Sequence, residues 1–345
     1  MLKKYILLLL LTLLVGTSVK DVYASGGQRN GTAGAQELLI PVGARGLALS
    51  GSYIAGLSGL ETIFYNPAGL GAMHSSAEAM FSHMSYIADI GISYAAVAVK
   101  FEGFGAIAFN VKTMDFGDIP VTTVQNPEGT GSTFSPTYVT IGVTYSNALT
   151  DRVRVGVTAN FISEKIMRTS ASGTSFSAGV QYHGMAGVEG LQMGVVIKNF
   201  GPQMKFDGPD LLRYATDEEG LRGRQFYKID AASFELPTQL ELGLAYEKSF
   251  AEEFKGLFSA SFSNNNFLND EYKFGGEISY NNLFFVRGGY TYTKEGVDDK
   301  DEQLFGPTFG AGLVLNTGID ITVDYAYRAA NYFDANHAIT VKLGF

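Results

Sequence analysis

Side chains that commonly carry out chemistry are few and widely spaced in this chain of 345 residues. The four histidines, His74, His83, His183 and His337, lack the spacing of a metal site or of a base beside a nucleophile. The sequence has no cysteine, and no glycine-rich phosphate loop follows an expected strand. No serine has a convincing histidine and acid to match it. We therefore expect no catalytic residues, no metal centre, no nucleotide site and no cofactor.

One acidic cluster has the oxygen ligands that calcium selects. It comprises Asp298, Asp299, Asp301 and Glu302. The spacing and the glycine of a calcium loop are missing, so we interpret the cluster as part of a solvated loop.

A short motif near the N-terminus has the residue types of a compact helical turn. The motif comprises Tyr65, Asn66, Pro67, Ala68 and Gly69, with Arg45 upstream of it. Asn66 can cap a helical turn, and Pro67 suits the first helical position. Gly69 or Gly71 can end the turn. Two roles stay open for these residues: a structural turn, or gating and contact with a ligand or partner.

From about residue 76 to the C-terminus, segments of roughly ten residues alternate apolar and polar side chains, which is the pattern of β-strands. Near the C-terminus, Ile339, Val341 and Leu343 share one face, while Thr340 and Lys342 share the other. The pattern predicts fourteen strands. Their approximate ranges are 76–86, 89–101, 103–115, 134–148, 152–166, 172–184, 191–200, 236–248, 253–265, 271–281, 283–294, 305–316, 318–328 and 336–345.

The connections between these segments decide which face meets water. Every second connection is tight, whereas the other set includes long ones at 116–133, 201–234, 295–304 and 329–335. Transmembrane barrels have this parity, with short periplasmic turns and longer outer loops. We therefore predict an all-β fold: a transmembrane antiparallel barrel of about 14 strands with apolar side chains facing lipid and charged ones facing the lumen.

The N-terminus has the three parts of a secretory signal. Lys3 and Lys4 precede a leucine-rich run that is too short for a membrane helix, and Val22 and Ala24 supply small residues for cleavage. The sequence predicts a signal peptide over 1–24, an N-terminal hatch or plug over 25–75 and a barrel over 76–345. The plug is expected because a lumen of fourteen strands is wider than its own side chains can fill.

The hatch motif carries a specific resemblance. Ala44-Arg45, Ser50-Gly51-Ser52-Tyr53 and the run from Tyr65 to Leu70 resemble the hatch of FadL-like outer-membrane barrels, and most resemble their PorV/PorQ-like subgroup. The C-terminal Phe345 resembles the signature that the outer-membrane insertion machinery of Gram-negative bacteria reads. The resemblance implies export to the outer membrane and no enzymatic activity.

Two functions follow from this resemblance. PorV/PorQ-like proteins are associated with type IX secretion, which implies binding of exported cargo or translocon components. The alternative is a FadL-like channel for long-chain fatty acids or other hydrophobic small molecules. In both, apolar residues of the long loops are the candidate contacts. They are Phe206, Leu211, Leu212, Tyr214, Phe226 and Tyr227.

The expected partners follow from the same reasoning. Outer-membrane lipid surrounds the barrel, and the insertion machinery acts during assembly. Secreted cargo, secretion components or a hydrophobic small molecule would contact the loops or lumen. The net charge of -9 excludes nucleic acid as an expected partner.

Overall fold

The protein is described here from a computed structural model that covers residue 29 and residues 31–216, 223–293, 303–316 and 318–345. The expected signal peptide and the acidic cluster at 298–302 lie outside these described residues. No helix in the described part of the chain is long and apolar enough to span a membrane.

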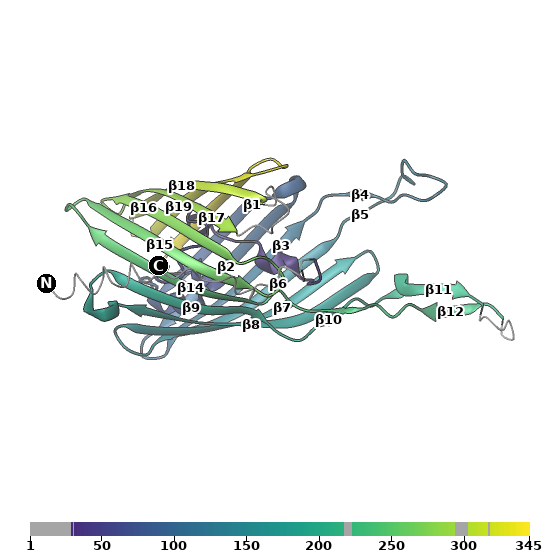
Figure 1. Cartoon of the computed structure of the whole chain (residues 1–345), viewed down its shortest axis with the longest axis horizontal. Helices are drawn as coiled ribbons and strands as arrows, with labels where there is room; N and C mark the ends of the chain where they lie inside the picture. Colours follow the sequence, from purple (N-terminus) through teal and green to yellow (C-terminus); the bar gives the residue numbers. More distant parts are fainter. Residues whose placement is uncertain (1–28, 30, 217–222, 294–302, 317) are drawn as a thin grey trace, which may run out of the picture.

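The strands close into one antiparallel barrel of fourteen strands, as predicted (Figure 1). In chain order they are β1 (Ala77–Ser85), β2 (Gly91–Phe101), β3 (Gly105–Asp115), β6 (Thr137–Ala148), β7 (Val153–Ile166), β8 (Thr169–His183), β9 (Leu191–Phe200), β14 (Gln239–Ser249), β15 (Phe254–Asn265), β16 (Glu271–Tyr280), β17 (Phe284–Thr293), β18 (Phe305–Asn316), β19 (Asp320–Ala330) and β20 (Asn336–Gly344). The first and last strands pair, with Phe81 opposite Val341, so the sheet leaves no open edge.

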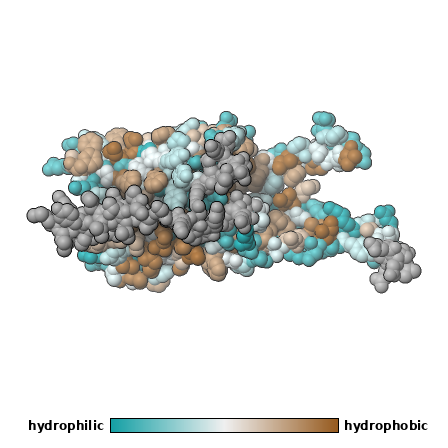
Figure 2. Space-filling view, viewed as in Figure 1, coloured by the Kyte–Doolittle hydropathy of each residue, from teal (hydrophilic) through white to brown (hydrophobic). Residues whose placement is uncertain are grey.

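The alternation of the sequence has the predicted orientation. On β14, Leu240, Leu242 and Leu244 are more than 40% exposed on the outer face. Gln239 and Glu241, between and beside them, are buried in the lumen. Hydrophobic side chains accordingly colour much of the visible barrel surface in Figure 2. An apolar exterior around a polar interior is the arrangement that hydrocarbon requires.

The two ends of the barrel differ. One end, here called the short-turn end, carries compact connections such as 281–283 between β16 and β17. The other, the long-loop end, carries the connections 116–136 and 201–238. One prediction there was wrong: β8 begins at Thr169, not residue 172, because Met167 takes a positive φ of 53° in a tight turn.

The long connections contain strands that the sequence pattern did not indicate. Two hairpins project from the long-loop end in Figure 1. One pairs β4 (Ile119–Pro120) with β5 (Thr133–Phe134), and the other pairs β11 (Leu212–Ala215) with β12 (Gln225–Lys228). Phe134 therefore belongs to a hairpin and not to the barrel strand predicted from residue 134. A third pairing, of β10 (Met204–Lys205) with β13 (Ser233–Phe234), lies between these loops and the wall.

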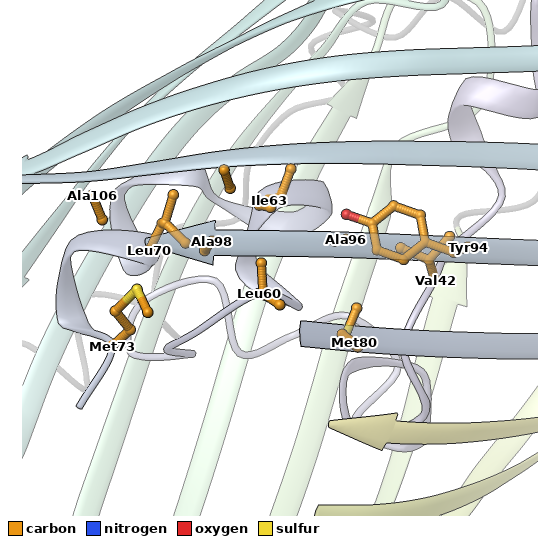
Figure 3. Close-up of a cluster of buried hydrophobic side chains, with 11 residues drawn as sticks. Val42, Leu60, Ile63, Leu70, Met73, Met80, Tyr94, Ala96, Ala98 and Ala106 are labelled. Carbon is orange, nitrogen blue, oxygen red and sulfur yellow. The ribbon is translucent and has the colours of Figure 1, made fainter. Parts of the chain in front are cut away.

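Residues 31–75, here called the inner segment, lie inside the barrel. Their short helices are η2 (Gln36–Leu39), α2 (Ala44–Ala48), α3 (Thr62–Tyr65) and η3 (Pro67–Ala72). Figure 3 shows Leu60, Ile63 and Leu70 of this segment against Ala96 and Ala98 of β2. The small wall residues leave room for the larger side chains of the inner segment.

Glycines on the inner face of the wall allow the backbone of the inner segment to approach closely. A Cβ atom on Gly156 would lie 2.4 Å from the carbonyl carbon of Pro67, and one on Gly179 would lie 2.0 Å from Asn66 Oδ1. Such distances are shorter than any side chain tolerates. The same holds for other inward glycines against the inner segment, namely Gly194, Gly243, Gly275, Gly289 and Gly310. The wall is thus shaped to fit this particular segment.

This fit predicts different outcomes at two adjacent glycines of β17. A Cβ on Gly289 would meet the Leu49 carbonyl carbon at 2.7 Å, whereas one on Gly288 finds its nearest neighbour, the Thr308 carbonyl oxygen, at 3.7 Å. We expect Gly289→Ala to lower the free energy of unfolding by about 1–3 kcal/mol through overpacking. Gly288→Ala should change it by less than about 0.5 kcal/mol. Denaturant titration of the refolded barrel in lipid vesicles measures both, and equal effects would contradict the fit.

Candidate functional site

A cavity of about 1050 Å³ opens at the long-loop end, above the inner segment. Its walls combine aromatic side chains with charged ones. The aromatic lining residues are Phe64, Tyr65, Tyr86, Phe116, Tyr138, Phe206, Phe234 and Phe305. A cavity of this size and lining can surround a small molecule that has a large apolar part.

Most charges that line this long-loop cavity are already paired. Glu241 accepts contacts from Lys198 Nζ at 2.5 Å and from Lys273 Nζ at 3.5 Å. Lys273 also lies 3.2 Å from Glu271. These residues are largely buried, and their mutual pairing compensates for the loss of water.

Three charged residues of this cavity, Glu37, Glu164 and Arg328, make no ion pair within the described residues, and Arg328 is the only cation among them. It is 8% exposed, and its Nε and Nη2 both donate to Asn336 Oδ1, at 2.9 and 2.8 Å. Within the described residues it makes no ion pair, and its guanidinium lies 3.6 Å from the ring centroid of Phe305. Tyr65 also lines the cavity, and its buried hydroxyl has no hydrogen-bond partner among the described residues. Burial raises the pKa of Tyr65, so this hydroxyl stays protonated and can donate.

A second cavity, of about 290 Å³, lies at the short-turn end below the inner segment. Arg45, Tyr53, Arg154, His183 and Gln192 are among its lining residues. No residue lines both this short-turn cavity and the long-loop cavity. The inner segment contributes lining residues to both cavities, which form two chambers of the lumen within the described residues.

Arg45 anchors the inner segment to the wall by charge. Its Nη2 and Nε donate to the two carboxylate oxygens of Glu277 on β16, at 2.8 and 3.0 Å. Arg287 Nε also donates to Glu277, and Arg287 Nη1 contacts Asp324 on β19. The network thus joins α2 to three strands, and a bidentate arginine–carboxylate pair is among the strongest polar contacts in proteins.

Asn66 holds the inner segment in place without facing either cavity. Its side chain accepts from Ala68 N at 3.2 Å, which confirms the predicted cap, and Pro67 occupies the first position of η3. Its Nδ2 donates to the carbonyls of Ile54 and Val180. The helix continues through Gly69 and Gly71 to Ala72, so the prediction that one of these glycines ends it was wrong.

The motif residues therefore separate in space. Tyr65 faces the long-loop cavity and Arg45 the short-turn cavity. Asn66, Ala68 and Gly69 are buried. The sequence motif thus contains one residue that lines each chamber, Tyr65 and Arg45, and a structural turn formed by the other residues.

The loop candidates also divide into two groups. Phe206 packs on Phe234, with ring centroids 5.7 Å apart, and lines the long-loop cavity. The others lie on η6 (Pro209–Leu211) or on the projecting β11–β12 hairpin. They are Leu211, Leu212, Tyr214, Phe226 and Tyr227. Leu212, Tyr214, Phe226 and Tyr227 are at least 38% exposed.

Ion pairs brace the base of the β11–β12 hairpin. Lys228 donates a hydrogen bond to Asp207, and Arg168 donates one to Asp210. Each hydrogen bond lowers the pKa of the carboxyl group that accepts it. Arg168 lies in the turn between β7 and β8, so it links the hairpin to the wall. At neutral pH these carboxyls are charged and the brace is complete.

The C-terminal residue closes the barrel. Phe345 N donates to Ala77 O at 2.9 Å, and Phe345 O accepts from Ser76 N at 2.8 Å. Its ring is 56% exposed on the outer face. The sequence resemblance to an insertion signal rested on this terminal aromatic residue.

Arg328 was missed as a site residue. It lies at the end of the strand predicted over 318–328, where charged side chains were expected only to face the lumen. The signal available was its position near the end of the strand 318–328, beside a long connection. Within the described residues, Arg328 has no acidic partner. This depends on contacts across the barrel, which one sequence does not display.

No family model and no curated protein matches the sequence. Solved structures do match. The Pseudomonas putida toluene transporter TodX has 11% identity and a TM-score of 0.54, over 86% of this chain and 96% of its own. CymD, a monoaromatic hydrocarbon channel, has 12% identity and a TM-score of 0.50, over 89% of this chain and 98% of its own.

At this identity the likeness establishes the fold alone. The chain has the β-barrel fold of these two proteins. A fold supports several functions, so the activity has to be argued from the cavities and loops of this chain.

The Arg45 network predicts a measurable effect on the separation of the two chambers. Arg45→Gln removes the bidentate contact but leaves Glu277 bound to Arg287, so the barrel should still fold. We expect a loss of about 1–3 kcal/mol in unfolding free energy and a higher ion conductance in planar bilayers. Arg29→Gln, which breaks an exposed pair with Glu235, is the matched control and should alter neither quantity. Wild-type conductance in Arg45→Gln would contradict the anchoring role.

Proposed function

We propose that this protein is an outer-membrane channel that takes up amphipathic molecules with a large apolar part. The long-loop cavity is the observation that carries the proposal. It is large, it is lined by eight aromatic side chains, and it opens at the end from which the long loops extend. In transmembrane barrels that end faces the outside of the cell.

The polar groups of this cavity favour a ligand with an anionic head. The Arg328 guanidinium has no acidic partner among the described residues, and the hydroxyl of Tyr65, which lines the same cavity, is a donor without an acceptor there. A carboxylate placed between them would satisfy both. The TodX and CymD structures are described as a transporter or channel of toluene or monoaromatic hydrocarbons, which supports the apolar half of the proposal.

Export fits the same proposal. The expected signal peptide over 1–24 would deliver the chain to the periplasm, and Phe345 would direct its insertion into the outer membrane. The inner segment would act as the hatch over 25–75, because it contributes lining residues to both chambers. The barrel fold and the outer-membrane neighbours support this location.

Uptake into lipid vesicles tests the proposal. Purified protein should accelerate entry of a long-chain carboxylate, and Arg328→Gln should reduce that uptake by about tenfold, the loss expected for one charge-assisted contact of about 1.4 kcal/mol. Uptake of toluene should change little in Arg328→Gln. Arg152→Gln, at an exposed turn of the short-turn end, serves as the control. Equal loss for both solutes would mean that Arg328 is structural, and no uptake of either solute by wild type would refute the channel.

A second function has its own observation. The β11–β12 hairpin projects beyond the barrel and carries Tyr214 and Phe226, whose ring centroids lie 5.0 Å apart, on an exposed surface. We propose, as the alternative, that this hairpin binds exported cargo or components of a type IX secretion system, as the PorV/PorQ-like resemblance implies. Exposed aromatic residues among polar ones are typical of contact surfaces.

Substitution on the hairpin separates the two functions. Tyr214→Ser with Phe226→Ser should abolish capture of secretion components or of proteins with a shared C-terminal sorting domain from detergent extracts, and should leave solute uptake unchanged. Val124→Ser, on the other projecting loop and 95% exposed, is the control. Consistent absence of such proteins from wild-type captures would remove the secretion function.

A further inference from the structure

Two glutamate side chains meet where the inner segment touches the wall. Glu37 lies on η2 and Glu164 on β7, and each is only 3% exposed. Both border the long-loop cavity. Both are buried where η2 packs on β7, and their carboxyl groups interact with each other there. Two ionised carboxylates in such contact repel, so the contact requires a proton or a cation between them.

Apolar packing keeps the two carboxyl groups together. Ala35 and Leu38, on either side of Glu37, belong to one buried cluster with Ile162, which precedes Glu164 on the same inward face of β7. The glutamates cannot separate unless this cluster opens. The repulsion therefore acts directly on the contact between η2 and the wall.

The nearby charged groups do not neutralise the pair directly. The titratable groups that face it are Lys112 on β3 and Tyr138 on β6, and Lys198 on β9 interacts with Lys112. Lys112 Nζ donates to the carbonyl oxygens of Glu37 and Ile40, at 2.6 and 3.1 Å. Lys198 Nζ is bound to Glu241. Neither carboxylate oxygen of Glu37 has a hydrogen-bond partner among the described residues.

We propose that Glu37 and Glu164 form a proton-binding site that fastens η2 to the barrel wall. One shared proton lets one carboxyl donate to the other and holds the inner segment in place. Loss of that proton leaves two negative charges in contact, and η2 moves away from β7. The site is separate from Arg328 and Tyr65, and the inference does not depend on which molecule passes through the barrel.

The direction of the pH effect follows from the docked state. Burial raises the pKa of Glu37, so the docked form binds the proton more tightly than the released form does. Docking is therefore favoured at low pH and weakens as the pH rises above the ordinary glutamate value. Release of one proton changes the docking equilibrium by at most about tenfold per pH unit.

Thiol labelling tests the site, because the chain has no cysteine of its own. Leu38→Cys places a thiol on η2 at a position that is 5% exposed, and Val124→Cys gives a fully accessible reference. In lipid vesicles, the labelling rate of Leu38→Cys relative to Val124→Cys should rise at least about fivefold between pH 6 and pH 8, within the tenfold-per-unit limit. A ratio that does not change with pH would overturn the proposal.

Isosteric amides provide the decisive comparison. In the Leu38→Cys background, Glu164→Gln supplies a permanent N–H donor to Glu37, so the thiol should stay protected at both pH values. Glu37→Gln should also keep the thiol protected at both pH values. Two variants are used so that a folding defect in one of them does not decide the test. Glu189→Gln, exposed in a turn of the short-turn end, should keep the full pH dependence. A pH dependence that survives in both Glu164→Gln and Glu37→Gln would overturn the proposal.

A metal chelator distinguishes a proton from a cation. With EDTA present at pH 6, protection of Leu38→Cys should be unchanged, because a proton holds the pair. Loss of protection on chelation would assign the contact to a divalent cation and overturn the proton site.

Discussion

The barrel wall depends on the inner segment for its apolar interior. Each buried hydrophobic cluster combines residues from both parts: Leu60 and Leu70 with Met80, for example, or Ala35 and Leu38 with Ile162. The outer face of the wall is adapted to lipid and the inner face to this segment, with alanine and glycine where the segment approaches most closely. The fold is therefore one cooperative unit, although strands alone cross the membrane.

This dependence limits how the lumen can open. Fully burying one leucine or isoleucine side chain contributes about 1.5–3 kcal/mol, and the inner segment buries many of them, including Leu49, Ile54, Leu57, Leu60 and Leu70. Complete ejection of the segment would thus cost more than about 7 kcal/mol, which is comparable to the whole stability of many domains. Passage by a local rearrangement of the segment is the physically available route.

The sequence predicted the strands well because their constraint is local and periodic. The spans 191–200 and 305–316 agree residue for residue with β9 and β18. The strand expected over 134–148 is present as β6, but its predicted start was wrong because Phe134 pairs with Ile119 outside the barrel. The contacts of Arg45 and Glu37 could not be predicted, because their partners lie on strands far away in the sequence and depend on how the inner segment sits in the lumen.

The inner segment is held differently along its length, and this difference determines which part can move. At the short-turn end, Arg45 binds Glu277 through two hydrogen bonds between opposite charges, a contact that persists over a wide pH range. Between the ends, the close fit at Gly156 and Gly179 leaves no space for sliding. At the long-loop end, Lys112 donates to the carbonyls of Glu37 and Ile40, and the proposed contact between Glu37 and Glu164 is the part that repulsion weakens when both carboxyl groups are charged. Motion that begins at η2 would enlarge the long-loop cavity while the contact between Arg45 and Glu277 stays intact. The two chambers can therefore open one after the other and not together.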